Sequence, residues 1–166
     1  YTDWSRGVSK DKVTIVFDTM HGSTTMLAKA IAEGVMAEGA DVRVCLLADG
    51  YFQGTHRSDI VTDILDSKAV LVGSPTLQDE VLPTVAGFLS YLRGLRPGRL
   101  GTKKIGCAFG SHGGMGGAVA QAEEALKAAG IEVIDGGFHV NYRPDADELA
   151  RAYDLGRRVA REIRAR

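Results

Sequence analysis

Residues 18–24, Asp18-Thr19-Met20-His21-Gly22-Ser23-Thr24, separate an apolar, β-branched run at 13–17 from a segment of helical period. A strand, a short loop and a helix in this order leave the first N–H groups of the helix free for an anion. The three hydroxyls and the glycine of this loop are typical of a phosphate cradle. The loop contains no Lys or Arg. It therefore favours one terminal phosphate monoester over a nucleoside triphosphate, whose loop uses a lysine.

A simpler interpretation is that Ser23 and Thr24 only cap a helix, since hydroxyl residues are favoured at helix starts. Two later loops favour a ligand. Residues 74–79 follow a short apolar run, although an ordinary Ser-Pro turn would also explain them. Residues 110–117 hold five glycines in eight positions, a large entropic cost unless the backbone approaches a ligand closely. These glycines do not match the dinucleotide-binding fingerprint.

The chain alternates between strand and helix patterns. Strands are expected over 13–17, 42–47, 69–73, 104–109 and 131–134, and helices over 24–38, 58–65, 83–93, 118–129 and after Pro144. This alternation predicts a doubly wound α/β fold with a five-stranded parallel sheet and helices on both faces. We expect the strand order 2-1-3-4-5, because it gathers the three loops at one switch point.

The candidate cofactor-binding residues therefore come from three loops. They are Thr19, Met20, His21, Gly22, Ser23 and Thr24 in the first, Ser74, Pro75, Thr76, Leu77 and Gln78 in the second, and Gly110, Ser111, His112, Gly113, Gly114 and Met115 in the third.

Composition excludes several classes of function. A formal net charge of -1 over 166 residues provides no basic field for nucleic acid, and no apolar run is long enough to span a membrane. The four histidines show no metal-ligand spacing, so no metal site is expected. Cys45 and Cys107 should be unpaired, since the predicted order separates their strands by roughly 14 Å. Unpaired thiols and the lack of a visible signal peptide favour the cytoplasm.

Several further segments carry a family resemblance: Val72-Gly73-Ser74-Pro75-Thr76, Leu82-Pro83-Thr84-Val85-Ala86-Gly87, Leu92-Arg93-Gly94-Leu95-Arg96-Pro97 and Ala108-Phe109-Gly110-Ser111. With the loop at 18–24, they make the chain resemble the flavodoxin-like domain of flavodiiron proteins over nearly its whole length. By this resemblance, residues 1–10 are expected to be the remnant of a linker from a metallo-β-lactamase-like domain, and residues 11–166 the FMN-binding domain.

The resemblance implies FMN as cofactor and an oxidoreductase activity in the full-length protein. Electrons would come from rubredoxin, or from reduced coenzyme F420 or an NADH-linked system. They would reach a diiron domain of the partner subunit that reduces dioxygen or nitric oxide. His21, His112 and Gly114 occupy places where the family usually has aromatics beside the flavin.

Two other functions are compatible with the same fold. A free-standing flavodoxin would only shuttle electrons between partners. A receiver-like signalling module would need an acidic cluster after the first strand, where this chain has only Asp18.

Overall fold

A computed structural model describes residues 10–47, 57–97, 103–113, 116–134 and 137–166. The expected linker at residues 1–10 lies outside this range except for Lys10. The elements are β1 (Lys10–Phe17), α2 (Ser23–Ala37), β2 (Asp41–Leu46), α3 (Arg57–Asp66), β3 (Ser67–Gly73), α4 (Pro83–Leu95), β4 (Ile105–His112), α5 (Gly117–Ala128), β5 (Glu132–Val133), β6 (Phe138–Asn141) and α6 (Ala146–Arg164).

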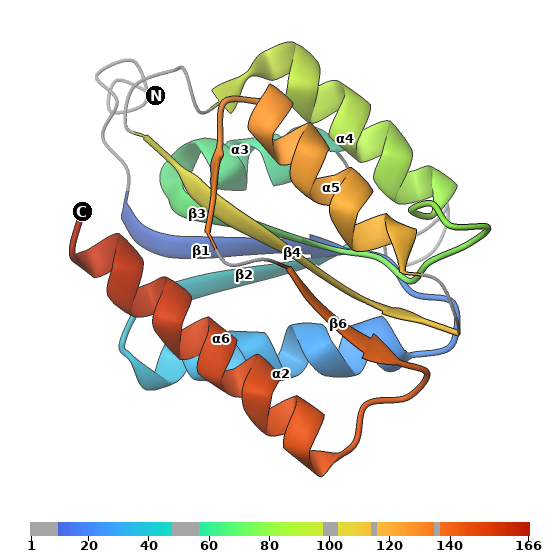
Figure 1. Cartoon of the computed structure of the whole chain (residues 1–166). Helices are drawn as coiled ribbons and strands as arrows, with labels where there is room; N and C mark the ends of the chain where they lie inside the picture. The colour runs from blue at the N-terminus through green and yellow to red at the C-terminus, as the bar shows by residue number, and fades with distance from the viewer. Residues whose placement is uncertain (1–9, 48–56, 98–102, 114–115, 135–136) are drawn as a thin grey trace.

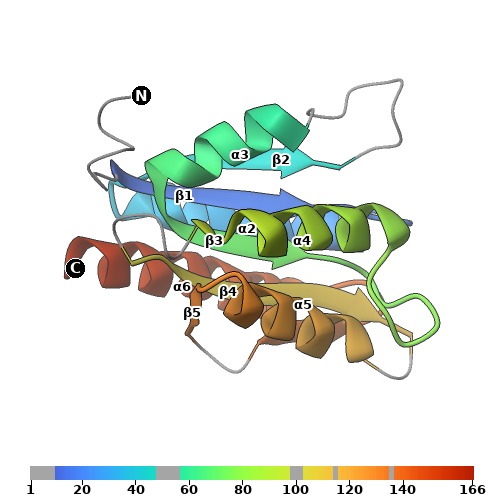
Figure 2. The same cartoon turned by 90° about the horizontal axis from the view of Figure 1, so that it is seen from above.

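The sheet is parallel and lies between two layers of helices (Figure 1). Its order is β2-β1-β3-β4-β5, which confirms the predicted order 2-1-3-4-5. Helices α2 and α6 cover one face, and α3, α4 and α5 cover the other, as the view from above shows (Figure 2). The carboxyl ends of β1, β3 and β4 therefore meet at one edge of the sheet.

Each central strand is buried on both faces. In β1, Val13 and Ile15 pack in the cluster beneath α2 and α6, whereas Val16 packs in the cluster beneath α3, α4 and α5. In β3, Leu71 and Val72 divide between the same two clusters. Strands that are buried on both faces have continuous apolar sequences, and for this reason the sequence predicted these strands well.

The expected fifth strand at 131–134 is corrected by the structure. Only Glu132–Val133 forms β5, which pairs with Ile105 and Gly106 of β4. A sixth strand, β6, pairs with the other end of β4, from Phe109 to His112. The two short strands share the fifth position, and Gly137 between them has a φ of 83° that a strand does not allow. Within the described residues the sheet has six strands, where the sequence predicted five.

Helices α2 and α6 touch at their backbones. A Cβ on Gly34 would lie 2.0 Å from the carbonyl oxygen of Tyr153, and one on Gly156 would lie 2.0 Å from that of Ile31. Near the end of α2, Arg157 and Arg161 of α6 each place a guanidinium nitrogen 3.0 Å from Glu38. The hydrogen bonds from Arg157 and Arg161 lower the pKa of the Glu38 carboxyl. The two helices are thus fixed along their length and at one end.

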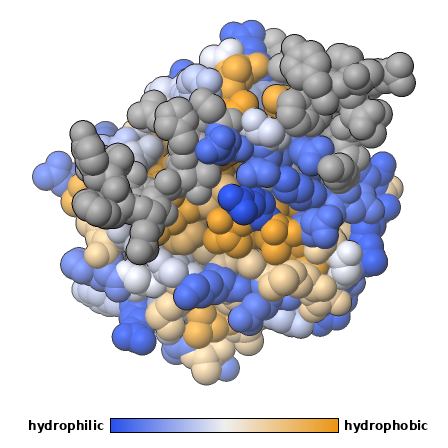
Figure 3. Space-filling model, turned by 180° about the vertical axis from the view of Figure 1, so that it is seen from behind, coloured by the Kyte–Doolittle hydropathy of each residue, from blue (hydrophilic) through white to orange (hydrophobic). Residues whose placement is uncertain are grey.

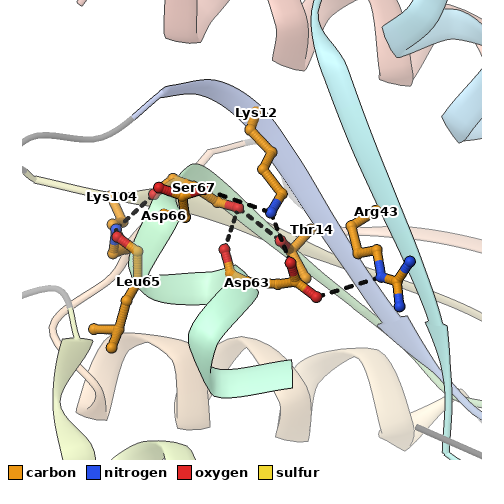
Figure 4. Close-up of polar contacts among 8 residues, drawn as sticks. All are labelled: Lys12, Thr14, Arg43, Asp63, Leu65, Asp66, Ser67 and Lys104. Atoms are coloured by element: carbon orange, nitrogen blue, oxygen red, sulfur yellow. Dashed lines mark hydrogen bonds and ion pairs between the residues drawn. The ribbon is translucent and has the colours of Figure 1, made fainter. Parts of the chain in front are cut away.

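A polar cluster lies at the amino edge of the sheet, opposite the three loops (Figure 4). Asp63 of α3 pairs with Lys12 of β1 at 2.7 Å and with Arg43 of β2 at 3.3 Å. Lys104 is 2% exposed, and its Nζ donates to the carbonyl oxygens of Ser67 at 2.5 Å and Leu65 at 3.3 Å. Burial lowers the pKa of Lys104 to about 8.

The remaining expectations concern thiols, membranes and metals. Cys45 and Cys107 are buried, and neither forms a disulfide within the described residues, as predicted. Among the described helices, none is both long and apolar enough to cross a membrane. No group of three His, Cys, Asp or Glu that could hold a metal occurs within the described ranges. In the view from behind, an apolar area lies at the centre with hydrophilic residues beside it (Figure 3).

The buried lysine predicts a rise of stability with pH. Below pH 8 Lys104 is charged in both folded and unfolded chains, and folding bears the full cost of burying that charge. Between about pH 8 and 10.5 the folded chain has released a proton that the unfolded chain still holds, so the free energy of unfolding should rise by up to about 3 kcal/mol. Denaturant unfolding across this range should show the rise in wild type and not in Lys104→Met. The exposed Lys127→Met is the control, and parallel curves for all three proteins would contradict the prediction.

Candidate functional site

A pocket of about 470 Å³ opens at the carboxyl edge of the sheet. The segments that follow β1, β3 and β6 form its walls together with the end of β4. The lining residues are Thr19, Met20, His21, Ser23, Pro75, Thr76, Ser111, His112, Gly113, Tyr142 and Arg143. The topology therefore brings the three predicted loops together around one cavity.

The loop between β1 and α2 is held by its own side chains. Asp18 accepts a hydrogen bond from the backbone N–H of Thr19 at 2.8 Å, and its other oxygen accepts one from the hydroxyl of Thr84 on α4. The hydroxyl of Thr19 accepts from the N–H of Gly22 at 2.9 Å. Gly22 has a φ of 87°, a left-handed conformation that favours glycine. The loop is thus shaped before any ligand arrives.

The start of α2 has no side-chain cap. Its N-cap residue is Gly22, and its first turn contains no acidic side chain. The hydroxyl oxygen of Thr24 is buried and has no hydrogen-bond partner. An unpartnered buried hydroxyl is costly, and the free N–H groups of a helix start favour an anion. The interpretation that Ser23 and Thr24 merely cap the helix is therefore not supported.

The loop after β3 contains a tight turn. Leu77 and Glu80 exchange two backbone hydrogen bonds of 2.8 and 3.0 Å, and Gln78 and Asp79 between them have positive φ angles. This geometry is that of a type I′ turn, in which both central residues are left-handed. Ser74 is buried and accepts a hydrogen bond from the N–H of Leu82 at 3.0 Å. The sequence did not indicate this turn, because neither central residue is glycine.

The same loop docks on the start of α5. Asp79 accepts from the N–H of Gly117 at 3.0 Å, and Gln121 on α5 accepts from the N–H of Val81 at 2.9 Å. The N-terminus of α5 is therefore occupied by a carboxylate of the protein itself. The start of α2, by contrast, has no acidic side chain in its first turn.

The predicted third loop begins later than the sequence suggested. β4 continues to His112, so Gly110 and Ser111 belong to the strand. A Cβ on Gly110 would lie 2.0 Å from the carbonyl oxygen of Ser74, and this glycine therefore serves the contact between two strand ends. Gly114 and Met115 lie outside the described residues.

Two histidines meet beside the pocket. The ring of His112, on its wall, lies 5.2 Å from that of His139 on β6, centroid to centroid, with 49° between the planes. A Cβ on Gly116 would lie 2.9 Å from Nδ1 of His139 and 3.0 Å from the ring of His112. A glycine at 116 leaves room for both rings.

Two pocket residues were missed from the sequence. Tyr142 and Arg143 follow β6, and they reach the pocket because β6 runs parallel to β4. No local motif marks them, and only the unpredicted strand brings them there. Arg143 is the one lysine or arginine among the described residues that line the cavity.

The candidate residues thus fall into three groups. Those on the cavity wall are Thr19, Met20, His21, Ser23, Pro75, Thr76, Ser111, His112 and Gly113. Those that support the wall or lie beside it are Gly22, Thr24, Ser74, Leu77, Gln78 and Gly110. The remaining two, Gly114 and Met115, fall in an undescribed segment.

Comparison with known proteins matches residues 15–156 to the flavodoxin family model. The chain is 48% identical over 165 residues to a coenzyme F420H2 oxidase of Methanothermobacter marburgensis, covering 99% of this chain and 39% of that protein. It is 42% identical over 164 residues to a nitric oxide reductase of Moorella thermoacetica, covering 98% and 39%.

Solved structures show the same relationship. Rubredoxin oxygen:oxidoreductase from Desulfovibrio gigas matches with a TM-score of 0.89 and 32% identity, over 98% of this chain and 38% of that one. The flavodiiron protein from Giardia intestinalis matches with a TM-score of 0.87 and 26% identity, over 98% and 38%. The chain thus spans about two fifths of the length of these relatives.

The left-handed backbone at the start of α2 predicts a specific glycine requirement. A Cβ at Gly22 would meet nothing within 4 Å, so Gly22→Ala should cost only the conformational energy of a left-handed alanine. We expect a loss of about 1 kcal/mol in the free energy of unfolding. Gly94→Ala is the matched control, because Gly94 is also sterically free but lies within helix α4. Denaturant titration should show the control gaining up to about 1 kcal/mol, and equal effects at both sites would refute this account.

Proposed function

Because the chain belongs to the flavodoxin family, we propose that it is the FMN-binding electron-transfer domain of a flavodiiron oxidoreductase. FMN is the cofactor that this family binds. The observation that carries the assignment to this pocket is the buried hydroxyl of Thr24, which has no partner beneath the uncapped start of α2.

The residues present fit a phosphate monoester at α2. Thr24 lacks a hydrogen-bond acceptor, and a phosphate oxygen would supply one. The hydroxyl of Thr19 accepts from Gly22 and still has a proton to donate. Ser23 lines the cavity, and no acidic side chain in the first turn opposes an anion. These groups would bind the phosphate without a cation from their own loop.

The rest of the pocket suits a planar ring system. Pro75, Thr76 and Gly113 form walls with little polar side-chain surface, and backbone hydrogen bonds within the sheet fix the strand ends behind them. Bound FMN would supply an acceptor and donor of one or two electrons, and its reduction adds negative charge to the pocket. The protein's own part is to bind, orient and surround the ring.

The partners of the full-length protein follow from its relatives. We propose that electrons pass from the FMN to a diiron domain of the partner subunit, for reduction of dioxygen or nitric oxide. The names of the relatives support either substrate, and they suggest reduced coenzyme F420 or rubredoxin as donor.

A free-standing electron carrier is less well supported, since the curated relatives of 42–48% identity are longer oxidoreductases. Two buried cysteines that form no disulfide in the described part of the chain suit a reducing cytoplasm.

Flavin binding tests the cofactor assignment. Purified protein loaded with FMN and desalted should retain a flavin absorption spectrum. FAD should bind much more weakly, because its phosphates are internal and cannot enter a cradle built for a terminal monoester. Equal affinity for FMN and FAD would contradict the proposal.

The same titrations define the part played by Thr24. Thr24→Val removes the hydroxyl and keeps nearly the same shape, and FMN affinity should fall by about 1 to 3 kcal/mol. Riboflavin, which has no phosphate, should bind the variant and wild type alike. If both flavins weaken equally in the variant, Thr24 has only a structural role.

The wall position of His112 predicts a pH-dependent potential. An imidazolium stabilises negative charge that is added beside it, so an imidazole at position 112 should make the FMN potential rise more steeply as pH falls. Potentiometry between about pH 5.5 and 8.5 should show a steeper pH dependence in wild type than in His112→Phe. Parallel curves would show that His112 is not coupled to the cofactor.

A further inference from the structure

We infer that Tyr142, which no sequence motif marks, is the aromatic side chain that covers the isoalloxazine ring in this pocket. The inference rests on the proposed FMN function and identifies a binding residue from an element outside the three loops. This residue directly follows β6 and lines the cavity.

The backbone fixes the place of Tyr142. β6 pairs with β4 in parallel register up to the pair His112 and Asn141. One residue later, the N–H of Tyr142 donates to the carbonyl oxygen of His112 at 2.7 Å. Tyr142 is therefore tied to the end of the strand whose last residues form the pocket wall.

The ring of Tyr142 lies against Gly113. A Cβ on Gly113 would be 3.2 Å from Cε1 of the tyrosine, and the phenol oxygen lies 3.3 Å from the carbonyl oxygen of Gly113. The ring thus covers bare backbone at the end of the β4 strand. A larger residue at 113 would push it from the wall.

Protein atoms bury only a small part of the Tyr142 ring. Tyr142 is 67% exposed, although it lines the cavity, and its φ of 58° is unfavourable for a residue with a Cβ. An aromatic ring gains stability when its face is buried, and this ring has a face left to bury. A planar ligand in the pocket is the group of suitable shape, because aromatic rings prefer offset-stacked or edge-to-face contact.

Tyr142 and the start of α2 would contact different parts of the cofactor. The start of α2 supplies the polar contacts, whereas Tyr142 lies beside His112 and Gly113 at the β4 side of the cavity. A tyrosine from the segment after β6 would provide ring contact at this side of the cavity.

Three variants test the inference. Tyr142→Asn removes the ring and keeps a residue that tolerates a left-handed backbone, so it should fold at least as well as wild type. Tyr142→Phe keeps the ring, and Tyr91→Asn changes an exposed tyrosine on α4, away from the pocket. The measurements are FMN and riboflavin affinity and the fluorescence of the bound flavin, which contact with a tyrosine ring quenches.

We expect Tyr142→Asn to weaken FMN and riboflavin by the same factor, about tenfold, and to brighten the bound flavin. Tyr142→Phe and Tyr91→Asn should bind both flavins as wild type does. Unchanged affinity and fluorescence in Tyr142→Asn, with wild type still binding FMN, would overturn this inference alone. Failure of wild type to bind either flavin would overturn the proposed function as well.

Discussion

The backbone contact between α2 and α6 at Gly34 and Gly156 is the constraint on which the pocket depends. Because neither glycine has room for a Cβ, the two helices lie at a fixed distance, and Glu38 ties the end of α2 to the arginines of α6. Fixing the body of α2 also fixes its other end, at the carboxyl edge of the sheet. The uncapped N–H groups of that end are therefore in place without a ligand. This arrangement supports the proposed anion site in a loop of seven residues that contains no lysine or arginine.

The starts of α2 and α5 have different electrostatic surroundings. At α5 the positive end of the helix is neutralised by Asp79, which also fastens the loop after β3. At α2 no acidic side chain occupies the first turn, and the hydroxyl of Thr24 is left without a partner. The start of α5 thus binds a carboxylate of the protein, whereas the first turn of α2 has no acidic side chain. Each of these helix starts requires a glycine. Gly117 has no room for a Cβ because Asp79 lies against it, and Gly22 has a left-handed φ.

Most of the fold could be predicted from the sequence, because the central strands are continuous apolar runs separated by clear helical periods. The predicted loops after β1, β3 and β4 do meet at one edge, since the strand order alone requires it. The division of the fifth strand could not be predicted, because Glu132–Val133 and Phe138–Asn141 are too short for a periodic signal. Tyr142 and Arg143 were missed for the same reason, as their place in the pocket depends on β6. The unpartnered state of Thr24 is a property of packing, and a sequence pattern carries no sign of it.

The divided strand has a consequence for the behaviour of the protein in a crowded solution. An edge strand that is long, flat and apolar invites pairing with another chain and so promotes aggregation. Here one edge is made of a two-residue strand and a four-residue strand, which offer little continuous backbone to an incoming chain. At the opposite edge, β2 carries the exposed charges of Asp41 and Arg43, and charges on an edge discourage such pairing. The division that hid β6 in the sequence thus makes this edge of the sheet a poor template for pairing with another chain.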